Sequence, residues 1–343
     1  MPNLEEFVDF NPEKDIPSLE GKVIFITGGT AGLGKASVLA LALHKPAHIY
    51  FSGRNAEAAK SLIAEVLNFG FLTQIYQYTL DPPTIILQFI VQYEVQNSNP
   101  SVGMTFVKMD MNSLASVKKA CAEFSHDRLD ILMCNAGVMY IPPGLSKDGF
   151  ENHFAINHLA HAMIIQELLP VMTRTAERPD SDVRLVSLTS TAWMGHPWHG
   201  VTFSTLRTTQ TGFMGASFRY GQSKLANILY AAEFARRYPD SKIKCVSVHP
   251  GPVHTDLTST LTFGQRIMIQ LVFWYLGVSF MEVAQGRLSQ IWAAAGARRD
   301  QLVNGAYYTP VGKLANGTLD KTAKSTKLAG ELWTFTQDVL AKF

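Results

Sequence analysis

Short, almost uninterrupted apolar runs recur along the chain and alternate with longer amphipathic stretches. Lys22–Thr27 is such a run, and its β-branched and aromatic residues are typical of a strand buried on both faces. Similar runs follow at His48–Ser52, Thr105–Met109, Leu129–Cys134, Val183–Thr189, Ile243–His249 and Ala306–Tyr308. Apolar strands separated by helices are typical of a parallel sheet covered on both faces. The pattern therefore predicts an α/β fold, a doubly wound Rossmann-type parallel sheet in a single domain spanning residues 1–343.

The stretches between these runs predict the helices that cover the sheet. We expect them at Lys35–His44, Ser113–Phe124, Phe150–Leu169, Tyr220–Arg237 and Met281–Ala295. Pro46 and Pro170 are expected to end the first and the third of these helices, because proline lacks an amide hydrogen and clashes with the preceding turn. Residues 1–20 form an acidic arm in front of the first strand.

The composition limits the class of protein. Lys and Arg number 30 against 28 Asp and Glu, a net charge of +2, which gives no electrostatic signal for nucleic acid. The hydrophobic fraction of 47% supports a buried core and excludes a disordered chain. The three cysteines are far apart and form no Cys-x-x-Cys pair, so we expect neither disulfides nor a metal site. Because the acidic arm lacks the features of a secretory signal, we expect a cytoplasmic protein.

A glycine-rich turn separates the first strand from the first helix. Gly28 suits a tight turn, Gly32 lets the backbone approach a pyrophosphate, and Gly34 lets the helix pack on the strand. The amides at the start of the helix then face the phosphates. The turn, with Thr30 and Leu33, is therefore interpreted as part of a dinucleotide site; the alternative is a glycine-rich surface turn.

The end of the second strand bears on the choice of cofactor. An acidic residue there binds the ribose 2′-hydroxyl of NAD, whereas an arginine accommodates the 2′-phosphate of NADP. The sequence reads Ser52-Gly-Arg54-Asn55, without an acid, so Arg54 favours NADP over NAD; the alternative is a solvated surface arginine. Asp110 follows the next strand and is expected to bind the adenine amino group or, alternatively, to cap a helix beginning at Met111.

Two Tyr-x-x-x-Lys pairs occur, and helix geometry separates them. Residues four apart share a face only where the helix is continuous, which is expected for Tyr220 and Lys224. Tyr238 is followed by Pro239-Asp240, which ends the helix, so Lys242 is not expected to stack beneath it.

The first pair suggests acid–base chemistry. A phenol has a pKa of roughly 10, and a lysine ammonium together with an oxidised nicotinamide would lower it. Tyr220 could then exchange a proton with a carbonyl or alcohol oxygen. Ser190, at the end of a strand, could hold the same oxygen, and its close rivals are Ser187, Thr189 and Thr191.

These motifs stand in the order found in a known family. They are Thr27-Gly28…Gly32…Gly34, Asn135-Ala-Gly137, Asn157, Ser190, Tyr220…Lys224 and Pro250-Gly-Pro-Val-His-Thr255. The chain resembles the short-chain dehydrogenase/reductase family over roughly residues 20–310. Three further segments resemble the subgroup of retinol dehydrogenases and WW-domain-containing oxidoreductases, here without a WW domain: Phe154-Ala-Ile-Asn157-His, Ser223-Lys-Leu-Ala-Asn227 and Leu332-Trp333.

The resemblance implies roles for individual residues. Tyr220 would be the catalytic acid/base, Lys224 would lower its pKa and hold the nicotinamide ribose, and Ser190 would bind the substrate oxygen. Asn157 would kink its helix and anchor a proton-relay water near Lys224; the alternative is a buried helix-capping amide. The remaining implied cofactor contacts are Asn135, Ala136 and Gly137 beside the adenosine, and Pro250, Gly251, Val253 and Thr255 on the nicotinamide side.

The resemblance also assigns the substrate side and the contacts between subunits. Residues 252–280 match the family's substrate lid and are strongly apolar, which implies a lipophilic small molecule or peripheral contact with a membrane. Ala192–Arg219 adds aromatic residues that could instead form a satellite core. Family habit suggests a homodimer or tetramer through Phe150–Leu169 and Tyr220–Arg237, faces that could equally be plain core.

The leading interpretation is an NADP-dependent oxidoreductase that interconverts a carbonyl and an alcohol on a lipophilic small molecule. One alternative is an NAD-preferring alcohol dehydrogenase. Another is a catalytically silent dinucleotide-binding scaffold or sensor, although such a protein would not need Tyr220, Lys224, Ser190 and Asn157 together.

Residues 67–95 do not read like the rest of the chain. These 29 residues carry two charges, Asp81 and Glu94, and six aromatic residues. Without them Arg54 and Asp110 would lie 27 positions apart instead of 56, which suits one helical crossover. We interpret the segment as a surface insertion or an in-frame retained intron; the functional alternative is a membrane-dipping hairpin around Thr84–Val91.

Overall fold

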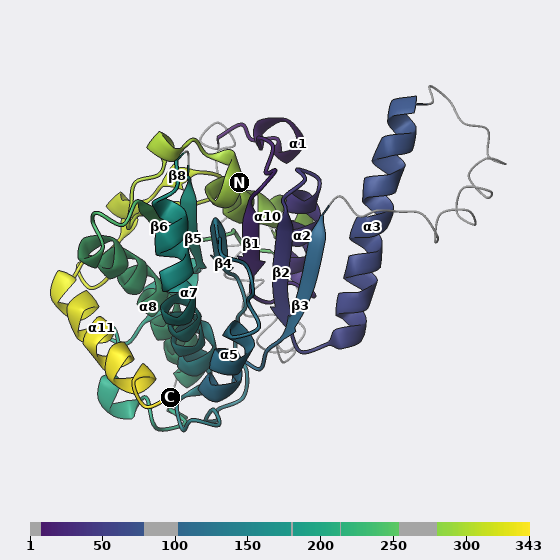
Figure 1. Cartoon of the computed structure of the whole chain (residues 1–343). Coiled ribbons are helices and arrows are strands. Elements are labelled where there is room, and N and C mark those ends of the chain that lie inside the picture. The colour runs from purple at the N-terminus through teal and green to yellow at the C-terminus, as the bar shows by residue number, and fades with distance from the viewer. Residues whose placement is uncertain (1–7, 79–101, 180, 213, 254–279) are drawn as a thin grey trace.

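The computed structural model describes residues 8–78, 102–179, 181–212, 214–253 and 280–343. Its centre is an eight-stranded sheet of order β3-β2-β1-β4-β5-β6-β7-β8, in which β8 alone runs antiparallel to its neighbour (Figure 1). The strands are β1 (Val23–Ile26), β2 (His48–Gly53), β3 (Gly103–Lys108), β4 (Ile131–Cys134), β5 (Val183–Leu188), β6 (Ile243–Val248), β7 (Tyr307–Thr309) and β8 (Lys313–Leu314). The strand order reverses between β1 and β4, so the prediction of a doubly wound parallel sheet is confirmed.

Helices cover both faces of this sheet. They are α1 (Pro12–Asp15), α2 (Gly32–Ala42), α3 (Ala56–Tyr78), α5 (Leu114–Cys121), α6 (Asn152–Phe154), α7 (Ala160–Ala176), α8 (Gly215–Arg237), α10 (Val283–Ile291) and α11 (Thr326–Leu340). Residues of α5, α7, α8 and α11 form the hydrophobic cluster on one face, and residues of α2, α3 and α10 form that on the other.

The continuous apolar runs of the sequence reflect this two-sided burial. In β1, Val23 and Phe25 belong to one cluster, whereas Ile24 and Ile26 belong to the other. All four are at most 2% exposed. Because side chains alternate along a strand, both faces must be apolar when both are covered by helices.

The prediction that Pro170 ends its helix is wrong. After the π-helical segment Ala155–Leu159, α7 runs through Pro170 to Ala176. Val171 and Met172, just beyond the proline, are buried in the core. Burying two such side chains contributes about 3–6 kcal/mol, which offsets a proline cost of about 3 kcal/mol.

The C-terminal helix α11 was not predicted from the sequence. Ser325 caps it by accepting a hydrogen bond from the amide of Leu328, and Trp333 stacks on Tyr230 of α8 with ring centroids 4.6 Å apart. This face of α8 is therefore covered by α11 of the same chain, which agrees with the alternative that it belongs to the core. The homodimer through α7 and α8 stays a prediction.

Two predicted segments fall largely outside the described residues. Of the suspected insertion, the backbone of 67–78 continues α3, and residues 79–95 lie outside the description. Among the side chains of α3 up to residue 67, Ala59, Leu62 and Val66 are buried. Of the predicted lid 252–280, residues 254–279 also lie outside it.

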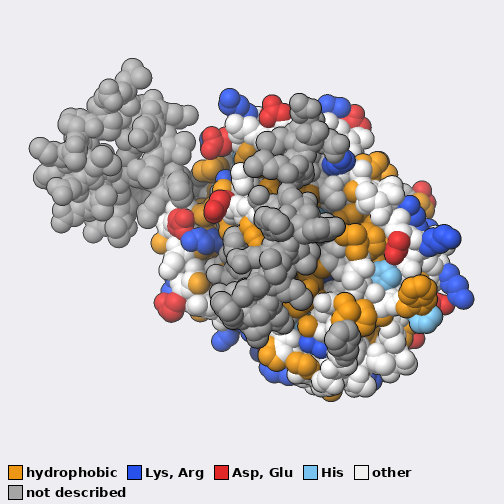
Figure 2. Space-filling model, turned by 180° about the vertical axis from the view of Figure 1, so that it is seen from behind, with side chains coloured by type: hydrophobic (Ala, Val, Ile, Leu, Met, Phe, Trp, Pro, Cys, Tyr) orange, Lys and Arg blue, Asp and Glu red, His pale blue; other side chains and the backbone are white. Residues whose placement is uncertain are grey.

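Charges are mixed on the surface. Seen from behind, the coloured part of the molecule carries acidic and basic side chains side by side rather than in separate fields (Figure 2). None of the described helices is both long and apolar enough to span a membrane.

Candidate active site

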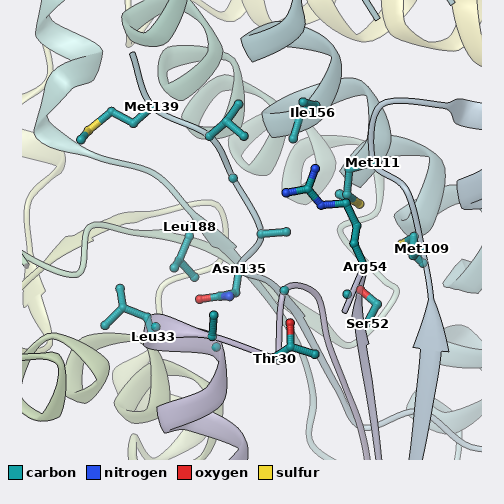
Figure 3. Close-up of a pocket in the computed structure, with 18 of the residues that line it drawn as sticks. Thr30, Leu33, Ser52, Arg54, Met109, Met111, Asn135, Met139, Ile156 and Leu188 are labelled. Atoms are coloured by element: carbon teal, nitrogen blue, oxygen red, sulfur yellow. The ribbon is translucent and has the colours of Figure 1, made fainter. Parts of the chain in front are cut away.

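A cavity of about 750 Å³ opens at the carboxyl ends of β1 and β4, where the strand order reverses. Figure 3 shows Arg54 and Met111 toward one end of this cavity and Met139 toward the other. Most of the residues expected at the site line it: Gly28, Thr30, Gly32, Leu33, Gly34, Arg54, Asp110, Asn135, Ala136, Gly137, Tyr220, Lys224 and Pro250. The structure thus brings together groups that are far apart in the sequence, in the crevice where doubly wound folds bind ligands.

The glycine turn fits a close backbone approach. A Cβ on Gly34 would lie 2.2 Å from the carbonyl oxygen of Gly28, and one on Gly28 would lie 3.0 Å from the Cα of Ala136. Helix α2 begins within this turn, at Gly32, and its N-cap residue Ala31 makes no side-chain cap. The first amides of α2 therefore lie at the cavity without a side-chain acceptor, which suits the phosphates of a dinucleotide.

Residues 135–138 form one wall of the cavity and are held by two side chains. The Thr27 hydroxyl accepts hydrogen bonds from the amides of Asn135 and Ala136, each 2.9 Å long. Asn157 accepts from the amide of Val138 at 2.8 Å and donates from Nδ2 to the Val138 carbonyl at 3.0 Å. Asn157 also lies in the π-helical segment, so its helix is irregular where the resemblance implied a kink.

The end of the cavity at Arg54 carries two charged side chains, the Arg54 guanidinium and the Asp110 carboxylate. Arg54 is exposed and lines the cavity. Asp110 accepts a hydrogen bond from the Lys147 ammonium at 2.8 Å, and this contact holds the pKa of its carboxyl below the usual range. The alternative that Asp110 caps the next helix is wrong, because Ser113 is the N-cap of α5 and accepts from the amide of Ser116.

Tyr220 and Lys224 lie on the continuous helix α8, and both are buried. The Lys224 Nζ donates to the carbonyl oxygen of Leu188 at 3.2 Å and lies 5.8 Å from the Tyr220 ring centroid. Tyr238 is the C-cap residue of α8, and Lys242 lies beyond it with a φ of 55°. The second pair therefore shares no helical face, as predicted.

Burial dominates the electrostatics of this pair. It raises the pKa of Tyr220 to about 12, and a hydrogen bond with Ser190 offsets this only in part. It also lowers the pKa of Lys224 to about 8. The expectation that Lys224 lowers the pKa of Tyr220 is therefore not met by the protein alone, in which the lysine ammonium points to the Leu188 carbonyl.

Of the four hydroxyls considered beside Tyr220, Ser190 is the one that acts on the pKa of Tyr220, which it lowers. Ser190 also caps the 3₁₀ turn Thr191–Gly195 by accepting from the amide of Ala192 at 3.2 Å. The Thr189 hydroxyl donates instead to the carbonyl of Lys224 at 2.7 Å, and Thr191 is exposed. Ser187 lies within β5.

The nicotinamide-side loop is described only in part. Pro250 lines the cavity, and Gly251 follows with a φ of 100°, a left-handed conformation that glycine adopts without strain. Val253 forms an isolated parallel bridge with Met281. Thr255 lies outside the described residues.

Sequence reasoning missed several residues of the cavity. Its apolar walls are extended by Met109, Met111, Val138, Met139, Ile141, Ile156 and Leu188. Gln290 of α10 donates to the Asn135 side chain at 3.2 Å, and the Tyr140 ring lies 5.8 Å from the Tyr220 ring. Only the apolar continuation after Asn135-Ala-Gly137 could have been read locally, because Gln290 reaches the site through tertiary packing.

A parallel sheet of this order, with a glycine turn at its switch point and a buried tyrosine–lysine pair in the same cavity, defines a dinucleotide-binding Rossmann fold. A family profile described as short chain dehydrogenase matches residues 90–205. The chain is 32% identical to an uncharacterized oxidoreductase of Schizosaccharomyces pombe, over 98% of this chain and 91% of that protein. A short-chain dehydrogenase/reductase of Aspergillus calidoustus is 29% identical, over 95% and 96% of the two chains. The chain therefore belongs to the short-chain dehydrogenase/reductase family, whose fold binds nicotinamide dinucleotides, and is an oxidoreductase of that type.

Solved structures share the fold. One from Mycobacterium paratuberculosis has a TM-score of 0.65 at 20% identity, covering 96% of this chain and 97% of that one. The NADPH-bound carbonyl reductase from chicken fatty liver has a TM-score of 0.52 at 18% identity, covering 86% and 98%. At sequence identities this low, the similarity establishes the fold alone, and that fold agrees with the sheet described above.

Proposed function

We propose that this protein is an NADP-dependent oxidoreductase that interconverts a carbonyl and an alcohol on a lipophilic small molecule. The observation that carries the proposal is one cavity that joins Arg54, the uncapped start of α2 and the Tyr220–Lys224 pair. A cation for a 2′-phosphate, amides for a pyrophosphate and a proton donor thus line the same cavity. The retinol dehydrogenase and WW-domain-containing oxidoreductase subgroup remains the proposed placement within the family.

The proton is assigned to the Tyr220 hydroxyl. When bound, the reduced nicotinamide supplies a hydride to the carbonyl carbon. Tyr220 donates its phenolic proton to the carbonyl oxygen, and Ser190 donates a hydrogen bond to the same oxygen. The raised pKa of Tyr220 keeps the phenol protonated near neutrality, which is the form that reduction requires.

Lys224 and Asn157 support this step. The Lys224 ammonium is held at the Leu188 carbonyl and would bind the nicotinamide ribose. Its positive charge would also stabilise the Tyr220 phenolate that forms when the proton leaves. Asn157 holds the wall at Val138, which keeps the cavity open between cofactor and substrate.

The preference for NADP is assigned to Arg54. The end of β2 reads Ser52-Gly-Arg54-Asn55, without an acid, and a guanidinium presents a planar fork of donors to a phosphate. The NADPH in the chicken carbonyl reductase, which shares the fold, is consistent with this choice.

The substrate is assigned to the apolar end of the cavity. Met139 lies toward the end of the cavity opposite Arg54, and Ile141 and Ile156 are further apolar residues of its lining. A lipophilic carbonyl compound would bury its hydrocarbon part against such side chains.

The test is NADPH oxidation, followed by absorbance, over a panel of aliphatic, alicyclic and aromatic ketones and aldehydes. Turnover should appear with lipophilic members. Tyr220→Phe should lower kcat by orders of magnitude and leave NADPH binding nearly intact, because only the hydroxyl is removed. Tyr238→Phe is the matched control and should change little. If Tyr220→Phe kept more than about a tenth of kcat, a barrier change below about 1.4 kcal/mol, the assignment would be wrong.

A further inference from the structure

The two side chains that hold the wall at residues 135–138 are joined by a third residue. His161 of α7 lies one turn after Asn157 and is 3% exposed. Its Nδ1 is 2.9 Å from the Asn157 carbonyl oxygen, and its Nε2 is 2.9 Å from the Thr27 hydroxyl. We propose that His161 is a positioning residue that fixes this wall relative to Lys224 and thereby sets the affinity for the nicotinamide dinucleotide. The proposal rests on the proposed function only in requiring that the cavity binds such a cofactor.

The hydrogen bonds of His161 have one consistent direction. A carbonyl oxygen only accepts, so Nδ1 must carry the proton that goes to Asn157. Burial and the nearby Lys224 ammonium lower the pKa of His161 to about 4, so the ring is neutral near neutral pH. Its Nε2 therefore has a free lone pair, and the Thr27 hydroxyl is the donor to it.

This donor direction fixes the Thr27 hydroxyl. A hydroxyl has one hydrogen and two lone pairs, and here both lone pairs face the amides of Asn135 and Ala136. The other acceptor near its hydrogen is the Met133 carbonyl, at the longer distance of 3.4 Å. Without His161 the hydroxyl would turn toward Met133, and one of the two wall amides would lose its acceptor.

The Nδ1 of His161 links the wall to Asn157 and, through it, to the surroundings of Lys224. The carbonyl that it holds belongs to Asn157, whose side chain clamps Val138 and donates to Ser223 at 2.9 Å. Gly137 lies between: a Cβ there would be 3.1 Å from the Asn157 Oδ1 and 3.5 Å from the Lys224 Nζ. A shift of this wall would therefore displace the contacts of Lys224 as well as the surface facing the cofactor.

The π-helical segment that precedes α7 supplies a comparison. His158, 2% exposed, hydrogen-bonds through Nε2 to the Thr336 hydroxyl at 3.0 Å. This is the same chemical pair at similar burial, but Thr336 belongs to α11, whereas Thr27 accepts from the wall amides of Asn135 and Ala136. If a buried histidine–threonine bond affected cofactor binding only through the stability of the fold, loss of either threonine hydroxyl should change the Kd for NADPH equally.

The experiment is calorimetric titration of the purified chain with NADPH. His161→Leu and Thr27→Val should each raise Kd about tenfold, the equivalent of about 1.4 kcal/mol. The double variant should be little weaker than either single one, because both break the same link. Thr336→Val should lower the melting temperature and leave Kd unchanged.

Conservative variants separate the two ends of the link. His161→Gln places an amide oxygen near the former Nε2, so it should bind NADPH within about threefold of the wild type. His161→Asn keeps the donor to Asn157 and lacks the acceptor for Thr27, so it should stay near the value of Thr27→Val. This pair decides the matter if His161→Leu does not fold.

The contradicting results are distinct. An unchanged Kd in His161→Leu, additive effects of about a hundredfold in the double variant, or equal loss in Thr336→Val would make His161 a packing residue. Equal binding by His161→Gln and His161→Asn would do the same. If the wild type bound neither NADPH nor NADH, the proposed function would fail first, and the role of His161 with it.

Discussion

The Nζ of Lys224 donates a hydrogen bond to the carbonyl oxygen of Leu188, 3.2 Å away at the carboxyl end of β5. Asn227, one turn further along α8, donates to the same oxygen at 3.0 Å. The carbonyl at the end of β5 thus fixes the position of the Lys224 ammonium of α8. The same burial lowers the pKa of Lys224 to about 8.

This lowered pKa predicts a pH limit for reduction. Below about pH 8 Lys224 is an ammonium and supports Tyr220, and above it the charge is lost. We expect kcat/KM for carbonyl reduction to be level near neutrality and to fall as the pH rises through about 8. A profile that stayed level to about pH 10 would show that the charge of Lys224 is not needed.

Arg54 predicts the coenzyme preference. Arg54→Ala should raise KM for NADPH about tenfold or more and change KM for NADH little, because a charge-assisted contact to the 2′-phosphate contributes about 1.5–3 kcal/mol. Arg298→Ala, which removes another exposed arginine, is the control. Equal effects on both coenzymes would return Arg54 to the role of a solvated surface residue.

Buried histidines predict how stability depends on pH. Burial lowers the pKa of His158 to about 3 and those of His161 and His249 to about 4, from 6.5. As the pH falls below 6.5 the unfolded chain takes up protons that the folded chain does not, so stability is lost down to about pH 4. Each such histidine should remove about 1.4 kcal/mol per pH unit in this window.

Urea unfolding from about pH 7.5 to about 4.5 measures this slope. His158→Gln should reduce this slope by about 1.4 kcal/mol per pH unit, because one proton fewer is taken up on unfolding. If the free energy of unfolding did not vary over this range, the buried rings would take up protons in the folded protein as readily as in the unfolded chain.

The suspected insertion predicts a tolerated deletion. Removing residues 67–95 keeps Ala59, Leu62 and Val66, through which α3 joins the core. We expect the shortened chain to fold, to bind NADPH with the wild-type Kd and to be more soluble, because an apolar segment is lost. Calorimetry and sedimentation check this. A shortened chain that failed to fold or to bind NADPH would make the segment integral to the protein.

The sequence by itself determined the features that depend on local order. A run such as Val23–Ile26 must be buried on both faces because it has no polar side, and this alone predicts covering helices. The glycine turn and the Tyr220–Lys224 spacing were equally readable, since a turn and a shared helix face are set by neighbours a few positions apart.

Only the tertiary structure decided what depends on distant partners. Pro170 stays within a helix because the core buries the residues beyond it, and the pKa of Tyr220 rises because the fold removes it from water. His161 meets Thr27 across 134 positions, so no local pattern could assign its ring nitrogens. Local sequence specifies which chemical groups are present, whereas burial and long-range packing set their protonation, their partners and their orientation in the cavity.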